Sequence, residues 1–123
     1  DLGVVAWTCD RVAVLYAGRV VERASVADLF AAPAHPHTAA LLAARPRLGD
    51  ERDRLPVLPG HHPTDAVPAG CAFHPRCPYA EPVCEAETPP LTTVDGDHEA
   101  ACLAHDGRLD GDLDYRVERS DGR

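Results

Sequence analysis

Four cysteines lie in one proline-rich stretch of the chain: Cys71, Cys77, Cys84 and Cys102, with the spacing C-x5-C-x6-C-x17-C. The stretch has too few apolar side chains to fold around a core of its own, so we expect a cross-link to hold it together. Four thiolates can bind an iron–sulfur cluster or a zinc ion, and four thiols can also pair as disulfides. These three possibilities predict different chemistry for the same residues.

The spacing of the cysteines bears on the choice between these possibilities. Zinc sites usually contain a pair of cysteines two to four residues apart, which this pattern lacks, whereas an iron–sulfur cluster accepts wider spacings. Disulfides require an oxidising compartment, and no basic segment followed by an apolar run begins the chain as in a signal peptide. His74 and His98 lie close enough in the sequence to replace a cysteine as a ligand. Cys9 is remote, and we expect it to be a small buried residue.

The composition excludes several functions. The net charge is −8 and no basic stripe is visible, so we expect no nucleic-acid partner. All 12 basic residues are arginine, and a phosphate-binding loop needs a lysine, so the chain cannot hold a complete nucleoside-triphosphate site. No apolar run is long enough to cross a bilayer, so we expect no direct membrane insertion. The amphipathic pattern is already under way at Asp1, which leads us to expect a truncated chain.

The first half of the chain has the pattern of a small α+β fold. We expect a helix over residues 1–8 and a β-hairpin in which strands 11–16 and 19–22 flank Ala17-Gly18. Ser25 is expected to cap a helix that ends at Pro33, and a second helix covers residues 38–44. Trp7 and Phe30 are expected in the core.

Little regular structure is expected in the second half. The charged segment 45–54 is the best candidate for a boundary, and residues 55–60 are expected to be extended. Residues 61–102 carry the four cysteines, and most of the tail that follows is expected to be mobile.

Several segments, taken in order, resemble the C-terminal part of the ATP-binding subunits of oligopeptide/dipeptide ABC importers. The likeness covers about residues 1–104, and its cysteine segment is its most specific part. The matching segments are DLGVVA at residues 1–6, CDRVAVLYAGRVVE at 9–22, LFAAPAHPHTAALL at 29–42, LPVLPG at 55–60, the segment from Pro68 to Cys84, and Ala101-Cys102.

The resemblance implies an α+β fragment with three parts. Residues 1–48 would be the C-terminal end of an ABC nucleotide-binding domain, formed by the β-hairpin and short helices. Residues 49–104 would be an irregular, metal-stabilised, cysteine-rich extension, and residues 105–123 a flexible charged tail. In this family the cysteines hold a [4Fe–4S] cluster, so the resemblance implies that Cys71, Cys77, Cys84 and Cys102 are its ligands, with zinc as the alternative.

The function that the resemblance implies is that of the subunit that energises ABC-type peptide import. Its partners would be the permease subunits and a second ATPase subunit, at the cytoplasmic face of the cell membrane. ATP and Mg²⁺ would belong to the full-length subunit, since its catalytic motifs would precede residue 1, and we expect no ATPase activity from this chain alone. Two other hypotheses remain: a free-standing metal-stabilised interaction module, and a small secreted disulfide protein.

Overall fold

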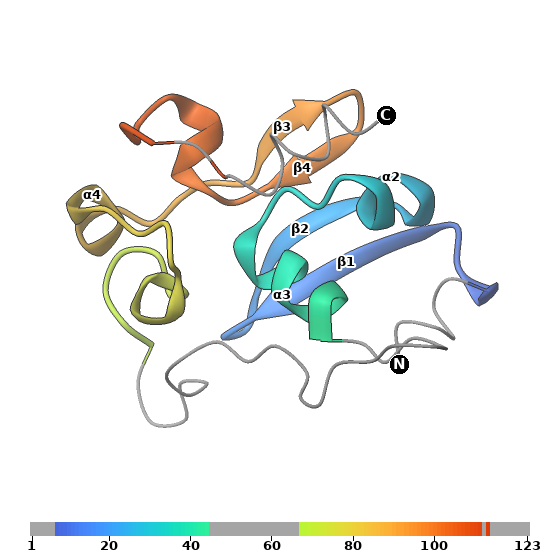
Figure 1. The fold of residues 1–123 in the computed structure, drawn as a ribbon, viewed down its shortest axis with the longest axis horizontal. Helices are drawn as coiled ribbons and strands as arrows, with labels where there is room; N and C mark the ends of the chain where they lie inside the picture. The colour runs from blue at the N-terminus through green and yellow to red at the C-terminus, as the bar shows by residue number, and fades with distance from the viewer. Residues whose placement is uncertain (1–6, 45–66, 112, 114–123) are drawn as a thin grey trace.

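The fold is a four-stranded antiparallel sheet with short helices, and its strands follow the order β1-β2-β4-β3 (Figure 1). The structure is a computed structural model that describes residues 7–44, 67–111 and 113. The strands are β1 (Arg11–Tyr16), β2 (Arg19–Ser25), β3 (Thr92–Asp95) and β4 (His98–Ala100). The centre of the sheet therefore joins β2 and β4, two strands that are far apart in the sequence.

The β1–β2 hairpin confirms the prediction for this segment. Ala17 and Gly18 form its two-residue turn with φ of 52° and 81°, and such positive values match the twist of the flanking strands. Glycine adopts this conformation without steric strain. The register shifts between Val14 and Leu15, and β2 runs on to Ser25 instead of ending at Glu22.

Two helices follow the hairpin, α2 (Val26–Ala31) and α3 (Pro36–Ala44), and α2 packs on both strands. Ser25 caps α2 as predicted: its Oγ accepts a hydrogen bond of 3.1 Å from the Asp28 N–H. The second helix begins two residues earlier than predicted. Proline suits the first position of a helix because its missing N–H would have no partner there.

The core combines side chains from the two halves of the chain. Its apolar cluster contains Phe73, which lies beside Cys71 and Cys77 in the sequence but packs among residues of the hairpin and α2. The other buried members of this cluster are Val14, Tyr16, Val21, Ala24 and Leu29. The cysteine-rich segment is therefore attached to the hairpin through a shared core.

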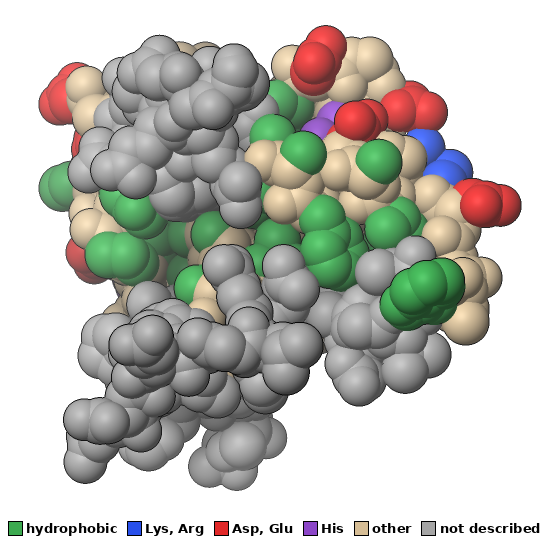
Figure 2. Space-filling view, turned by 45° about the vertical axis from the view of Figure 1, so that its right-hand side comes forward, with side chains coloured by type: hydrophobic (Ala, Val, Ile, Leu, Met, Phe, Trp, Pro, Cys, Tyr) green, Lys and Arg blue, Asp and Glu red, His purple; other side chains and the backbone are tan. Residues whose placement is uncertain are grey.

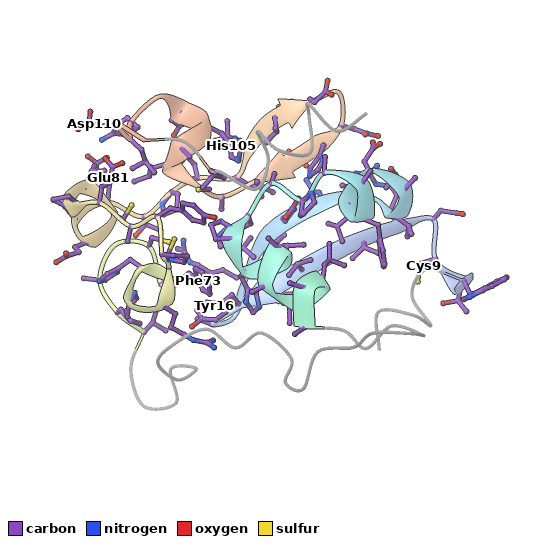
Figure 3. All side chains as sticks on the ribbon, viewed as in Figure 1. Cys9, Tyr16, Phe73, Glu81, His105 and Asp110 are labelled. Carbon is purple, nitrogen blue, oxygen red and sulfur yellow. The ribbon has the colours of Figure 1, made fainter. Side chains whose placement is uncertain are left out.

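Two predictions about buried residues are wrong, and a third is partly right. Cys9 is exposed and lies at one end of the molecule, well away from Phe73 in the core (Figure 3). Trp7 is 90% exposed. Trp7 and Cys9 both precede β1, and no described element covers either residue. Phe30 is half-buried and packs against the core cluster.

In Figure 2, apolar side chains form a band across one face, with acidic side chains at its edge.

The second half has more regular structure than the sequence indicates. It contains β3, β4, the helix α4 (Pro82–Ala86) and the 3₁₀ turns η1 (His74–Arg76) and η2 (Leu103–Asp106). The prediction of an irregular extension is therefore wrong at these elements. The reason is tertiary: β4 has only three residues, and it pairs with β3 on one side and with Glu22 and Arg23 of β2 on the other.

Several predictions fall on residues that the structure does not describe. They are most of the helix over residues 1–8, the boundary at 45–54 with the limits 1–48 and 49–104, the extended segment 55–60, and most of the tail 105–123. In the part of the chain that is described, no helix has the length and apolar character needed to cross a membrane.

Candidate metal centre

The four clustered cysteines come from different elements and line one small cavity. Cys71 precedes η1, Cys77 follows it, Cys84 lies in α4, and Cys102 lies between β4 and η2. In Figure 3 the sulfur atoms of this region gather on the side of the molecule opposite Cys9. The structure thus brings together the four residues that the sequence singled out, and it separates the fifth cysteine from them.

A close backbone approach positions Cys71 against Cys84. The Cys71 N–H donates to the Cys84 carbonyl at 2.8 Å, and Gly70 stands directly before it with φ of 72°. A Cβ added at Gly70 would lie 2.4 Å from the Cys84 carbonyl oxygen, which is closer than real Cβ contacts. Only glycine therefore allows these two segments to meet, a requirement that the sequence pattern did not reveal.

Burial favours the protonated form of three of the thiols, those of Cys71, Cys77 and Cys102. It raises the pKa of Cys77 to about 11 and that of Cys102 to about 12, and it also raises the pKa of Cys71. Neighbouring thiols raise the pKa of Cys77 and Cys102 further by electrostatic repulsion. A bound cation lowers the pKa of the thiols instead, because it favours the thiolate that coordinates it.

Backbone N–H groups lie against three of the sulfur atoms. They lower the pKa of these thiols, whereas burial raises it. Each of these hydrogen bonds lowers the pKa of the thiol that it reaches, without cancelling the effect of burial. Such donors around a sulfur stabilise a metal-bound thiolate. They come from Phe73 and His74 at Cys71, from Tyr79 and Ala80 at Cys77, and from Ala104 at Cys102.

The side chains around this cavity do not form a finished coordination shell. Among the residues that the structure describes, no three histidine, cysteine or acidic side chains are grouped closely enough to hold a metal ion. The cavity has a volume of about 20 Å³, which is room for one water molecule or a small ion. A four-iron cluster is larger, so binding one requires the four cysteine side chains to move apart.

The two histidines considered as ligands occupy different places. His74 lines the cavity of the cysteines, and its Nδ1 lies 2.8 Å from the Cys71 carbonyl oxygen, so one ring nitrogen is engaged with backbone. His98 is not among the described residues of that lining. Its Nε2 lies 2.5 Å from Glu22 Oε2 in a buried pair that joins β4 to β2.

Glu22 is a buried anchor that the sequence pattern did not reveal. It has no exposed surface, and its carboxylate accepts hydrogen bonds from the Ala34 and His35 N–H groups at 2.6 and 3.0 Å. With His98 it ties β2, β4 and the loop before α3 to each other. Burial lowers the pKa of His35 to about 3, with smaller contributions from His37 and His105. From the sequence, a glutamate near the end of a predicted strand is expected to be exposed. The tertiary packing buries Glu22 instead.

Comparison with known proteins identifies the family. Residues 21–84 match the family described as the oligopeptide/dipeptide transporter, C-terminal region. The chain belongs to this family. It is 52% identical over 104 residues to a Sinorhizobium fredii protein named "Probable peptide ABC transporter ATP-binding protein y4tR", and the match covers 83% of this chain and 31% of that protein.

Two further relatives are oligopeptide transport ATP-binding proteins. AppD of Bacillus subtilis is 44% identical over 107 residues, covering 86% of this chain and 33% of AppD. OppD of Salmonella typhimurium is 44% identical over 104 residues, covering 84% of this chain and 31% of OppD. The chain therefore spans about a third of the length of the curated relatives that it matches.

The match to the family's C-terminal region ends at Cys84, so Cys102 lies outside the matched residues. The sheet brings Cys102 to the other cysteines. The N–H of the preceding residue, Ala101, donates to the Val21 carbonyl at 2.8 Å, which continues the β2–β4 pairing up to the cavity.

Proposed function

We propose that this chain is the C-terminal part of the ATPase subunit that energises ABC-type peptide import. Its membership of the oligopeptide/dipeptide transporter family supports this proposal, as do the names of its relatives, which are ATP-binding proteins of peptide transporters. Its partners would then be the permease subunits and a second ATPase subunit at the cytoplasmic face of the membrane. ATP and Mg²⁺ would bind the full-length subunit, because this chain has no lysine for a phosphate-binding loop.

We further propose that Cys71, Cys77, Cys84 and Cys102 hold a [4Fe–4S] cluster, with a structural zinc ion as the alternative. The observation that carries this proposal is the convergence of all four residues on one cavity. Backbone N–H groups already lie against three of the sulfurs. When bound, the centre would supply a cross-link between η1, α4 and the segment after β4, where little apolar surface holds the chain.

Metal analysis of the purified chain tests the proposed centre. We expect iron and acid-labile sulfide together with the visible absorbance of a cluster, and we expect Cys77→Ser to lose all three. Cys9→Ser is the matched control, because Cys9 is exposed and remote from the cavity. One equivalent of zinc without iron would refute the cluster and support the structural zinc ion. Disulfides in the intact mass, with no metal bound, would refute both.

The coding sequence upstream of Asp1 tests the proposed role in transport. We expect a continuous reading frame that encodes a phosphate-binding loop with the pattern G-x4-G-K-[ST] and an ABC signature. A start codon at the beginning of this chain, with no such frame before it, would refute the transport role. That result would favour a free-standing metal-stabilised interaction module.

A further inference from the structure

A second and much larger cavity lies between the turn of the hairpin and two proline-containing segments of the cysteine region. Its volume is about 440 Å³, which is within the range of small-molecule sites. Residues 67–73 form one wall and residues 88–91 another, while Tyr16 and Arg19–Val21 close it from the hairpin. The proposed metal centre is in the neighbouring cavity, and only His35, Cys71 and Phe73 line both.

The lining of this cavity is apolar except at a few positions. Prolines and aliphatic side chains dominate it, and no carboxylate occurs among its described lining residues. The hydroxyl of Thr88 already donates to the Gly70 carbonyl at 3.2 Å. Among the described lining residues, one side chain is cationic: Arg19, which is exposed at the start of β2.

Arg19 differs from the other arginines near the sheet. Arg11, Arg23 and Arg108 each form an ion pair with a carboxylate: Asp97, Glu99 and Glu87, respectively. Arg19 has no hydrogen bond or ion pair with any residue in the described ranges. Within the described ranges, Arg19 therefore places a positive charge without a partner beside an apolar cavity, where a ligand can reach it.

His35 provides a second polar group in the wall. It is 1% exposed, and its Nδ1 accepts a hydrogen bond of 3.0 Å from the His37 N–H. Because an amide N–H can only donate, Nδ1 carries no proton and the ring proton lies on Nε2. The ring is therefore a neutral N–H donor among the lining residues.

We propose that this cavity binds a small organic anion: a carboxylate joined to an aromatic or aliphatic body. Arg19 pairs with the carboxylate, and the prolines and aliphatic side chains of the two walls enclose the apolar body. Charge complementarity selects the anion, since the lining residues that the structure describes offer the Arg19 cation and no acid to hold an ammonium group.

Titration of the full chain with phenylbutyrate, followed by amide-detected NMR, tests this site. Phenylbutyramide, which is neutral and of similar shape, is the matched control ligand. We expect the carboxylate to bind about tenfold more tightly than the amide, because a hydrogen-bonded charge pair is stronger than a neutral contact. The amide signals that shift should be those of the walls, such as Val20, Gly70 and Leu91. Equal affinity for both ligands, shifts confined to other residues, or no shift at millimolar ligand would overturn the proposal.

Two variants separate the charge from the cavity. Arg19→Gln should remove the preference for the carboxylate and leave amide binding unchanged, whereas Arg11→Gln, at the far end of the hairpin, should change neither. Ala69→Phe places a ring into the cavity from an exposed position and should abolish binding of both ligands. If Ala69→Phe does not fold, Arg19→Gln still decides, and unaltered carboxylate binding by that variant would refute the site. Metal content should be unchanged in Arg19→Gln, so this result and that for the metal centre are independent.

Discussion

Residues 7–44 and residues 67–111 form one sheet, but different interactions hold the two regions in place. In the first, local signals coincide with the elements: a two-residue turn joins β1 to β2, and Ser25 caps α2. In the second, the strands are short and polar, and contacts with the first region determine their position. The comparison shows that a segment with little core of its own can fold on the edge of a neighbouring hairpin.

Two buried contacts join the regions in addition to the strand pairing. Phe73 of the second region is 1% exposed within the core of the first, where its ring packs edge-on against Tyr16 at 5.1 Å. Glu22 of the first region pairs with His98 of the second in a site that is buried on both sides. The regions should therefore unfold together, and substitutions at the contacts between them measure how far they depend on one another.

The largest effect is expected from Phe73→Ala. It removes the ring that fills the shared core, and such substitutions cost about 3–5 kcal/mol of unfolding free energy. Phe30→Ala is the control, because Phe30 is half-buried at the edge of the same cluster. Urea unfolding monitored by circular dichroism measures both. Equal losses for the two variants would show that the regions do not share a core.

Glu22→Gln should be the next most damaging change. The amide keeps one acceptor but places an NH₂ group where the carboxylate receives N–H donors from Ala34 and His35. Breaking a buried pair from one side costs about 3–5 kcal/mol, whereas an exposed pair contributes about 0–1 kcal/mol. Glu99→Gln, which breaks the exposed pair with Arg23 in the same sheet, is the matched control. A similar unfolding free energy for both variants would contradict the role given to Glu22.

A smaller effect is expected from Gly70→Ala, and it should be local. Both Gly70 and Gly96 have positive φ, but only at Gly70 would a Cβ meet backbone. A non-glycine residue in this conformation costs about 1–3 kcal/mol, so we expect Gly96→Ala near the lower end and Gly70→Ala above it. Gly70→Ala should also separate Cys71 from Cys84 and lower the metal content. Retention of metal equal to that of Gly96→Ala would refute the positioning role of Gly70.

The smallest effect is a dependence of stability on pH in the metal-free protein. Folding raises the pKa of Cys77 and Cys102 above the ordinary value of 9.0, to about 11 and about 12. The folded state therefore binds these protons more tightly, so the stability they contribute is complete below pH 9 and is lost as pH rises toward 11–12. The urea midpoint should fall across this range, and it should fall less in Cys77→Ser. An equal fall in that variant would assign the effect to other groups.

The parts of the fold that could be predicted are those with a local cause. The turn at Ala17-Gly18 and the cap at Ser25 depend on residues within a few positions of each other, and the structure confirms both. The strands β3 and β4 could not be predicted, because their pairing with β2 is decided by residues far away in the sequence. Glu22 and Phe73 were missed for the same reason, since burial is not a property of a residue's own neighbourhood.

By itself, the sequence determined the hairpin, the helix cap and the choice of the four cysteines as the candidate site, because residue type and spacing carry that information. Only the tertiary structure decided that these cysteines line one cavity and that Cys9 lies away from it. It also decided that the cysteine segment depends on the hairpin, through Phe73 in the core and the Glu22–His98 pair. The physical reason is that burial and backbone pairing arise between distant segments, which meet only when the chain has folded.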